Sequence, residues 1–149
     1  MKKPLAAAIL WAVSLASMAA DSAPASGPAT PNWLAQARQA IEAKNYDLAV
    51  TVLNQSDQKS SADWHNLMGY SLRKKTPPDL PAAEKNYQMA LEKDPKHRGA
   101  LEYYGELKVL QGDLAGARRL LARLDQVCTF GCPEAEELRR WIATGAQPS

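Results

Sequence analysis

The chain has 149 residues, a length that allows one domain and excludes a larger multidomain arrangement. Hydrophobic residues make up 46% and charged residues 23%, so the chain can bury a core, and its many alanines and leucines favour helix. The net charge of +2 comes entirely from Lys2 and Lys3, which leaves the remainder neutral and argues against nucleic acid or an anionic membrane as a partner.

The first 19 residues have the order of a secretory signal peptide. Lys2 and Lys3 precede an apolar run from Leu5 to Leu15, and the small residues Ser17 and Ala19 follow it as a cleavage box. The run is too short to span a bilayer, which takes ~20 apolar residues. We therefore expect a periplasmic or secreted protein, with residues 1–19 removed as the signal peptide and no membrane insertion afterwards.

Residues 20–31 are small, Pro-rich and nearly uncharged, which is typical of a flexible linker. A second small-residue box at residues 23–25 offers another cleavage point. An uncleaved N-terminal anchor is the alternative to a cleaved leader.

The clearest helical pattern lies at residues 83–95. Small residues at Ala83 and Ala90 flank the aromatic Tyr87, and Pro95 closes the segment. A similar segment follows 34 residues later, where Ala117 corresponds to Ala83. A fixed spacing of this size indicates an internal repeat.

The helix before each of these segments also carries a small residue, Gly69 in the earlier unit and Gly105 in the later one. Asp113 is a good N-cap for the later segment, and Asp79, with Pro81 in the first turn, for the earlier one. Two extra residues fall within 74–79, in a turn, where insertions are tolerated.

An upstream unit shows the same layout, with Ala37 as the small residue of its first helix. Ala49 begins its second helix, and Leu53 takes the aromatic position. No proline closes this unit; Ser60 and Ser61 stand there instead.

This layout resembles the tetratricopeptide repeat (TPR) family. The resemblance covers roughly residues 31–128, with units at about 31–61, 62–97 and 98–128. The chain departs from the family in three places: the first unit lacks the glycine, the second turn is long, and the last unit lacks the proline. It implies an all-α fold, a right-handed α-solenoid of about three helix-turn-helix hairpins over residues 32–128. A generic helical bundle is the alternative.

The repeated small residues predict close helix packing. Ala37, Gly69 and Gly105 would let each first helix approach its own partner helix, where Ala49, Ala83 and Ala117 supply the other side of the contact. Leu53, Tyr87 and Leu121 would then fill the space towards the next hairpin. Because one hairpin cannot bury its apolar face alone, neighbouring hairpins must stack.

Residues 129–144 are predicted to form a cysteine loop and a C-terminal capping helix, with a disordered tail at 145–149. Pro133 suits the first helical position, and glutamates in the first turns complement the helix dipole. Leu138, Trp141 and Ile142 form one apolar stripe, which would cover the last exposed face of the array.

Cys128 and Cys132 are the only cysteines, and in an exported protein an even pair indicates a disulfide. The Cys-x-x-x-Cys-Pro pattern also resembles the copper motif of the Sco family of copper chaperones, although the thioredoxin-like fold and distant histidine of that family are not indicated here. A redox-active dithiol is a further alternative.

The TPR resemblance implies a concave groove lined by the first helix of each unit. By register, the groove-facing residues are Arg38, Asn66, Tyr70, Arg73, Glu102, Tyr103 and Glu106. This mixed set departs from the basic clamp that grips a C-terminal carboxylate in some repeats, so that ligand is not implied. Arg38 and Arg73 are instead candidates to pair with carboxylates of an extended peptide. Solvated helix faces are the alternative.

Motifs for phosphate-cradling loops, nucleophile elbows, zinc-binding histidines and haem attachment are absent from the sequence. We therefore expect no enzyme activity, no cofactor and no metal site. The leading prediction is a periplasmic interaction scaffold or assembly factor that binds a protein or peptide in the groove. The alternatives are a thiol-dependent copper-handling or redox factor and an accessory subunit of a larger complex.

Overall fold

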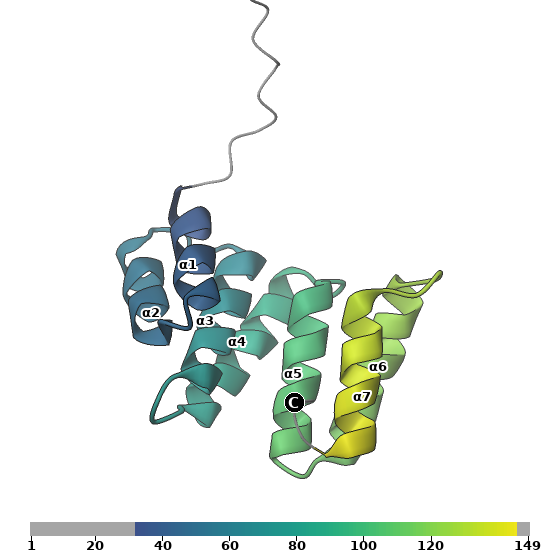
Figure 1. Ribbon diagram of the computed structural model, residues 1–149. Coiled ribbons are helices and arrows are strands. Elements are labelled where there is room, and N and C mark those ends of the chain that lie inside the picture. Colours follow the sequence, from purple (N-terminus) through teal and green to yellow (C-terminus); the bar gives the residue numbers. More distant parts are fainter. Residues whose placement is uncertain (1–31, 146–149) are drawn as a thin grey trace, which may run out of the picture.

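A computed structural model describes residues 32–145. Within this range the chain is all-α, as predicted, and contains no strand (Figure 1). The helices are α1 (Asn32–Glu42), α2 (Tyr46–Gln55), α3 (Ala62–Lys74), α4 (Leu80–Lys93), α5 (Arg98–Leu110), α6 (Leu114–Val127) and α7 (Pro133–Thr144). The predicted signal peptide (1–19), linker (20–31) and all but the first residue of the tail lie outside the described residues.

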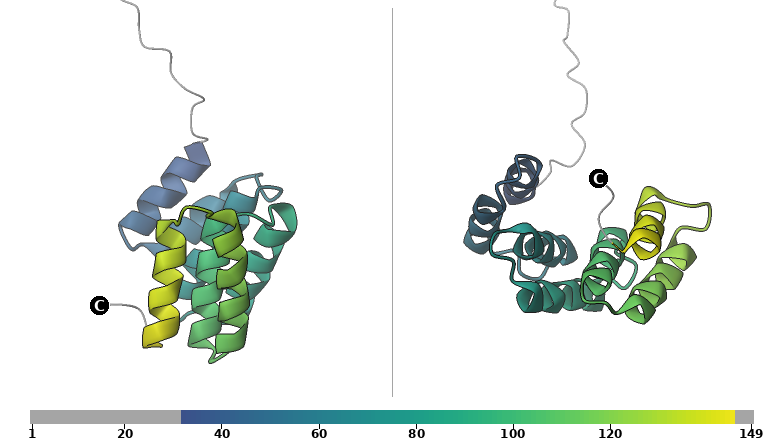
Figure 2. Two further views of the ribbon diagram at one scale, coloured as in Figure 1. Left: turned by 90° about the vertical axis from the view of Figure 1, so that its right-hand side faces the viewer. Right: turned by 60° about the horizontal axis from the view of Figure 1, so that its bottom comes forward.

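The first six helices pack mainly against their neighbours in the sequence. The pairs α1 and α2, α3 and α4, and α5 and α6 are in contact, and α2 with α3 and α4 with α5 join one pair to the next. The final helix, α7, contacts both α5 and α6. The result is an arc of helices with α1 at one end and α7 at the other, as the right-hand view of Figure 2 shows.

The helices begin where short polar side chains cap them. Asp79 accepts a hydrogen bond from the Ala82 amide at the start of α4, and Asp113 accepts one from the Gly116 amide at the start of α6, so both predicted N-caps are confirmed. Pro133 is the first residue of α7, also as predicted. Capping satisfies backbone donors that a helix start leaves without an intrahelical partner.

The predicted small residues are buried at their helix contacts. Ala37, Ala49, Ala83 and Ala117 have no accessible surface, and Gly69 and Gly105 are buried. Among the residues expected beside them, Leu53 and Tyr87 are fully buried and Leu121 is partly buried.

The two glycines admit different neighbours. A Cβ atom on Gly69 would lie 2.8 Å from the Tyr87 ring and 3.1 Å from the Ala83 carbonyl oxygen, so this glycine does admit its partner helix α4. A Cβ on Gly105 would lie 2.5 Å from Leu138. The nearest neighbour of Gly105 is therefore a side chain of α7, a helix outside the repeat pattern, and the expected approach of its own partner helix α6 stays a prediction.

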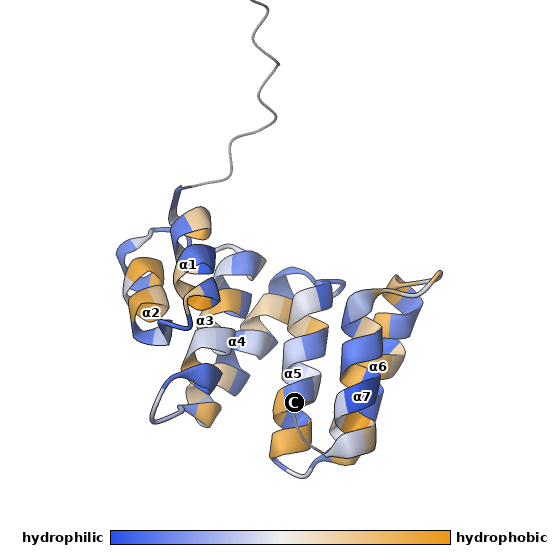
Figure 3. Ribbon diagram, in the orientation of Figure 1, coloured by the Kyte–Doolittle hydropathy of each residue, from blue (hydrophilic) through white to orange (hydrophobic). Residues whose placement is uncertain are grey.

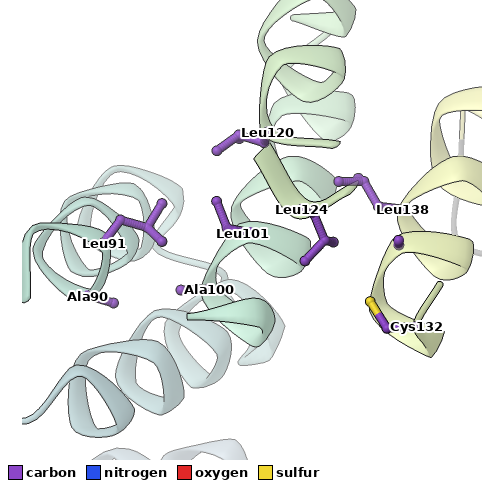
Figure 4. Packing of buried hydrophobic residues seen from close by; sticks show 9 residues of the cluster. Ala90, Leu91, Ala100, Leu101, Leu120, Leu124, Cys132 and Leu138 are labelled. Atoms are coloured by element: carbon purple, nitrogen blue, oxygen red, sulfur yellow. The ribbon is translucent and has the colours of Figure 1, made fainter. Parts of the chain in front are cut away.

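The largest core cluster joins the last four helices. Leu91 of α4, Leu101 of α5, Leu120 and Leu124 of α6 and Leu138 of α7 meet there (Figure 4). Apolar and polar residues alternate around the helices (Figure 3), so each helix buries its apolar face and turns its polar face to the solvent. The predicted stripe on α7 is confirmed, because Leu138 and Trp141 are buried and Ile142 packs against the cluster.

A second cluster holds the first three helices together. Leu53 of α2 packs with Trp64 and Met68 of α3, and Ala37 of α1 completes the contact. The Trp64 indole Nε1 donates a 2.8 Å hydrogen bond to the Leu53 carbonyl oxygen. This bond fixes the end of α2 against the start of α3.

Polar side chains tie α4 to α5 at the surface. The Glu84 carboxylate accepts hydrogen bonds from Lys108 at 2.6 Å, Gln111 at 2.8 Å and Tyr104 at 2.9 Å. The bond from Lys108 and then that from Gln111 are the main reasons why the pKa of Glu84 is lowered to about 2. In the described part of the chain, no helix has both the length and the hydropathy needed to cross a membrane.

Candidate functional site

A cavity of about 810 Å³ opens between residues of α1, α3 and α5. Residues of α1, α3, α5 and the loop between α4 and α5 form most of its wall, and Val127 and Glu134 complete it. Four of the seven predicted groove residues line it: Arg38, Asn66, Glu102 and Tyr103. Tyr70, Arg73 and Glu106 do not.

Arg38 is one of three exposed basic residues of the cavity wall, with Lys96 and Arg98. It lies on α1, one turn before Ile41 and Glu42, which also line the cavity. Among the described residues no carboxylate is paired with it. Its guanidinium therefore has donors that are free of any ion pair, and the pairing of Arg38 with a ligand carboxylate stays a prediction.

Glu102 is a cavity-lining carboxyl group that is only 8% exposed. None of the hydrogen bonds or ion pairs found in residues 32–145 involves its side chain. Burial, reinforced by the nearby carboxylates Glu106, Glu134 and Glu137, raises the pKa of Glu102 to about 8. Arg73 opposes this rise without overcoming it.

Asn66 lies beside Glu102 in the cavity wall and is 6% exposed. Its amide lies against the start of α5, where a Cβ atom on Gly99 would be 3.1 Å from the Asn66 Nδ2. The Asn66 Oδ1 atom is buried and has no hydrogen-bond partner among the described residues. A buried acceptor without a partner is costly, so a group on a ligand that donates to it gains affinity.

Two polar contacts link residues of the cavity wall, and one of them is an ion pair. The His97 Nε2 atom lies 3.2 Å from the Asp63 carboxylate, and the His97 Nδ1 atom accepts a hydrogen bond from the Ala100 amide at the start of α5. The Arg98 guanidinium lies 3.5 Å from the Glu134 Oε1 atom. The other oxygen of Glu134, Oε2, is buried without a partner.

The remaining predicted groove residues form a closed cluster behind the cavity. The Arg73 and Glu106 side chains, 3% and 6% exposed, form a 2.5 Å ion pair that joins α3 to α5. Burial raises the pKa of Glu106, and Arg73 opposes the rise. The expectation that Arg73 is free to pair with a peptide carboxylate is therefore corrected, because Glu106 already occupies its guanidinium.

Aromatic rings surround this ion pair. The Arg73 guanidinium lies 5.5 Å from the ring centre of Tyr70, 5.8 Å from that of Tyr103 and 5.7 Å from that of Trp141. The Tyr70 and Tyr103 rings are in turn 4.7 Å apart. Tyr103 therefore belongs to both the cluster and the cavity wall, and it links the buried ion pair to the cavity.

Cys128 and Cys132 form a disulfide, with their Cα atoms 5.7 Å apart, as predicted. It closes the loop between α6 and α7. Within residues 32–145, the one group of potential metal ligands consists of these two sulfurs and Glu134, all within 4.8 Å of one another. Since a disulfide offers no thiolate, copper binding would need the reduced pair, and the copper or redox alternative stays a prediction.

Sequence reasoning missed several cavity residues: Asp63, His97, Arg98 and Glu134. His97 and Arg98 begin α5, outside the positions that the repeat register marks as groove-facing. Glu134 was attributed to the helix dipole, yet its side chain turns inward to Arg98. No spacing in the sequence indicates that α7 reaches the cavity.

Comparisons with family models, with curated proteins and with solved structures found no match to this chain.

Proposed function

We propose that this protein is a non-enzymatic scaffold or assembly factor of the TPR type, exported to the periplasm, that binds a protein or peptide partner along the inner side of its helical arc. The succession of contacting helix pairs and the burial of the repeated small residues support the TPR assignment. The order of charge, apolar run and cleavage box in the sequence supports export.

The cavity is the observation that carries the proposal. Its volume of about 810 Å³ lies within the range of sites that hold a ligand of several side chains. Its wall comes from α1, α3, α5 and α7, so a bound segment would contact most of the length of the arc. Extended peptides bind repeat proteins on such continuous inner surfaces.

The polar groups of the wall suit recognition. Arg38 offers donors, while Asn66 and Glu102 offer acceptors that have no partner among residues 32–145. Few, fixed polar groups in a partly apolar cavity set the orientation and identity of a ligand.

A charge reversal at Arg38 tests the proposal. We expect Arg38→Glu to lose the partners that crosslink to the wild-type protein in the exported fraction, because a carboxylate would replace an exposed guanidinium of the cavity. Arg118→Glu is the matched control, since Arg118 is an exposed arginine of α6 that does not line the cavity. If Arg38→Glu kept every native partner, the groove would not be the binding surface.

The same reversal at Arg73 is not an informative test. Arg73→Glu would place two carboxylates in the buried position now held by the Arg73–Glu106 ion pair. The variant would lose its fold before it lost a partner.

A further inference from the structure

The chemistry of the cavity wall indicates which side chain of a partner it receives, and this inference rests on the proposed function. Two oxygen atoms of wall residues, Asn66 Oδ1 and Glu134 Oε2, are buried without a hydrogen-bond partner among the described residues, and the Glu102 carboxyl group makes no hydrogen bond there. Asn66 and Glu102 are both more than nine-tenths buried. A ligand that fills this part of the cavity must therefore bring donors.

Arg98, which contacts Glu134, and Arg73, which acts on Glu102, are already engaged, whereas Arg38 and Lys96 of the same wall have no ion pair among the described residues. Arg98 is paired with Glu134 Oε1, and the His97 ring is held by Asp63 and the Ala100 amide. Arg73 is paired with Glu106 in the cluster behind the wall. Glu102 is thus left facing other carboxylates without a cation of its own.

We propose that this acceptor site, formed by Asn66, Glu102 and Glu134, binds an arginine or lysine side chain of an extended partner segment. A guanidinium carries five N–H donors and an ammonium three, and neither has an acceptor that would oppose the carboxylates. The charge of the ligand complements that of the site, and the Tyr103 ring in the same wall offers an apolar surface to the stem of the side chain.

The electrostatics of Glu102 agree with this assignment. Glu106 on its own helix and Glu134 and Glu137 on α7 add to burial in raising its pKa. A bound cation would act in the opposite direction, because an opposite charge at close range favours the ionised carboxylate. A cationic ligand would therefore shift Glu102 towards its ionised form.

The test uses three pentapeptides that differ in one side chain. Each is acetylated, amidated and built of alanine, with arginine, citrulline or glutamate at the centre. Citrulline keeps the shape of arginine but not its charge, and arginine itself does not titrate. Binding to the purified full protein is followed by NMR chemical shifts of the backbone amides in α3 and α5, at pH 9, where Glu102 is ionised.

We expect the arginine peptide to shift the amides of Asn66, Gly99 and Glu102 and to bind at least about tenfold more tightly than the citrulline peptide, because a charge-assisted hydrogen bond is the stronger one. Glu102→Gln should remove this preference. Glu92→Gln, at an exposed site on α4 away from the cavity, should keep it. A thermal melt of each variant establishes that it is folded.

Equal binding of the arginine and citrulline peptides, or preference for the glutamate peptide, would overturn the inference. So would an arginine preference that survives Glu102→Gln. The proposed function is tested separately: if Arg38→Glu abolishes partner crosslinking while the arginine preference is absent, the groove binds a partner but not through a basic side chain.

Discussion

At the residue scale, the inner face of the arc contains two kinds of buried charge. Arg73 and Glu106 neutralise each other, whereas Glu102 is buried among like charges. The burial of Glu102 among other carboxylates adds nothing to the stability of the fold, since burial penalises an ionised carboxylate. Its presence in a cavity wall is what a binding site requires, and perturbed groups of this kind gather at functional sites.

Glu102 should therefore limit stability at high pH. Its pKa is about 8 when folded, above the ordinary value of 4.5, so the folded chain holds a proton that the unfolded chain releases, and stability falls as the pH rises from 4.5 to 8. We expect Glu102→Gln to be more stable than wild type at pH 9, by about 1–3 kcal/mol, and the gap to close towards pH 4.5. Urea denaturation at the two pH values measures it, and a constant gap would contradict the account.

Removal of the Glu102 carboxylate should stabilise the fold, whereas removal of Arg73 or Glu106 alone should destabilise it. Because removal of one partner leaves the other charge buried and unpaired, Arg73→Met or Glu106→Leu alone should destabilise the fold by about 3–5 kcal/mol. The double variant should recover most of that loss, since an apolar pair of similar volume needs no desolvation. Chemical denaturation of the three variants checks this. Additive losses would mean that the two side chains act independently.

At the element scale, α7 is held by close packing and by a covalent link. Gly105 leaves room for the fully buried Leu138, and the Cys128–Cys132 disulfide closes the loop that leads into α7. Since Glu134 of α7 lies in the cavity wall, the position of this helix also determines the shape of the site.

The contact between Gly105 and Leu138 is suited to a double-mutant cycle. Gly105→Ala gains helix propensity of about 1 kcal/mol, but its Cβ would overlap Leu138, so we expect a net loss of about 1–2 kcal/mol. Leu138→Ala should cost about 2–5 kcal/mol by leaving a cavity. The combined loss should be smaller than the sum, because the added methyl group occupies part of that space. Thermal and urea melts give the coupling, and simple additivity would refute the contact.

The disulfide should stabilise α7 modestly, because its loop is short. Closure of a loop of this length contributes about 2 kcal/mol. We expect protein purified without reductant to show no reactive thiol. We expect the Cys128→Ser, Cys132→Ser double variant to unfold at a lower temperature, with α7 first to lose amide protection. Two reactive thiols in the native protein would instead favour the copper or redox alternative.

At the scale of the whole molecule, the sequence predicts what depends on local periodicity. Spacing and capping chemistry predict the N-caps Asp79 and Asp113, the first helical residue Pro133 and the buried small residues. The structure agrees with these predictions. Contacts between distant helices do not follow from spacing. The pairing of Arg73 with Glu106, 33 residues away, depends on how two helices pack side by side, and three of the seven predicted groove residues lie outside the cavity wall.

The central claim is that a partner lies along the inner side of the arc, and site-specific photo-crosslinking tests it most directly. A photoreactive side chain is placed at Ile41 or Lys96, which line the cavity, and at Lys85 or Arg118, which lie on helices α4 and α6 and do not. The account predicts the same partner crosslinked from both cavity positions and none from the other two. Crosslinking to that partner only from Lys85 or Arg118, or equally from all four positions, would contradict it.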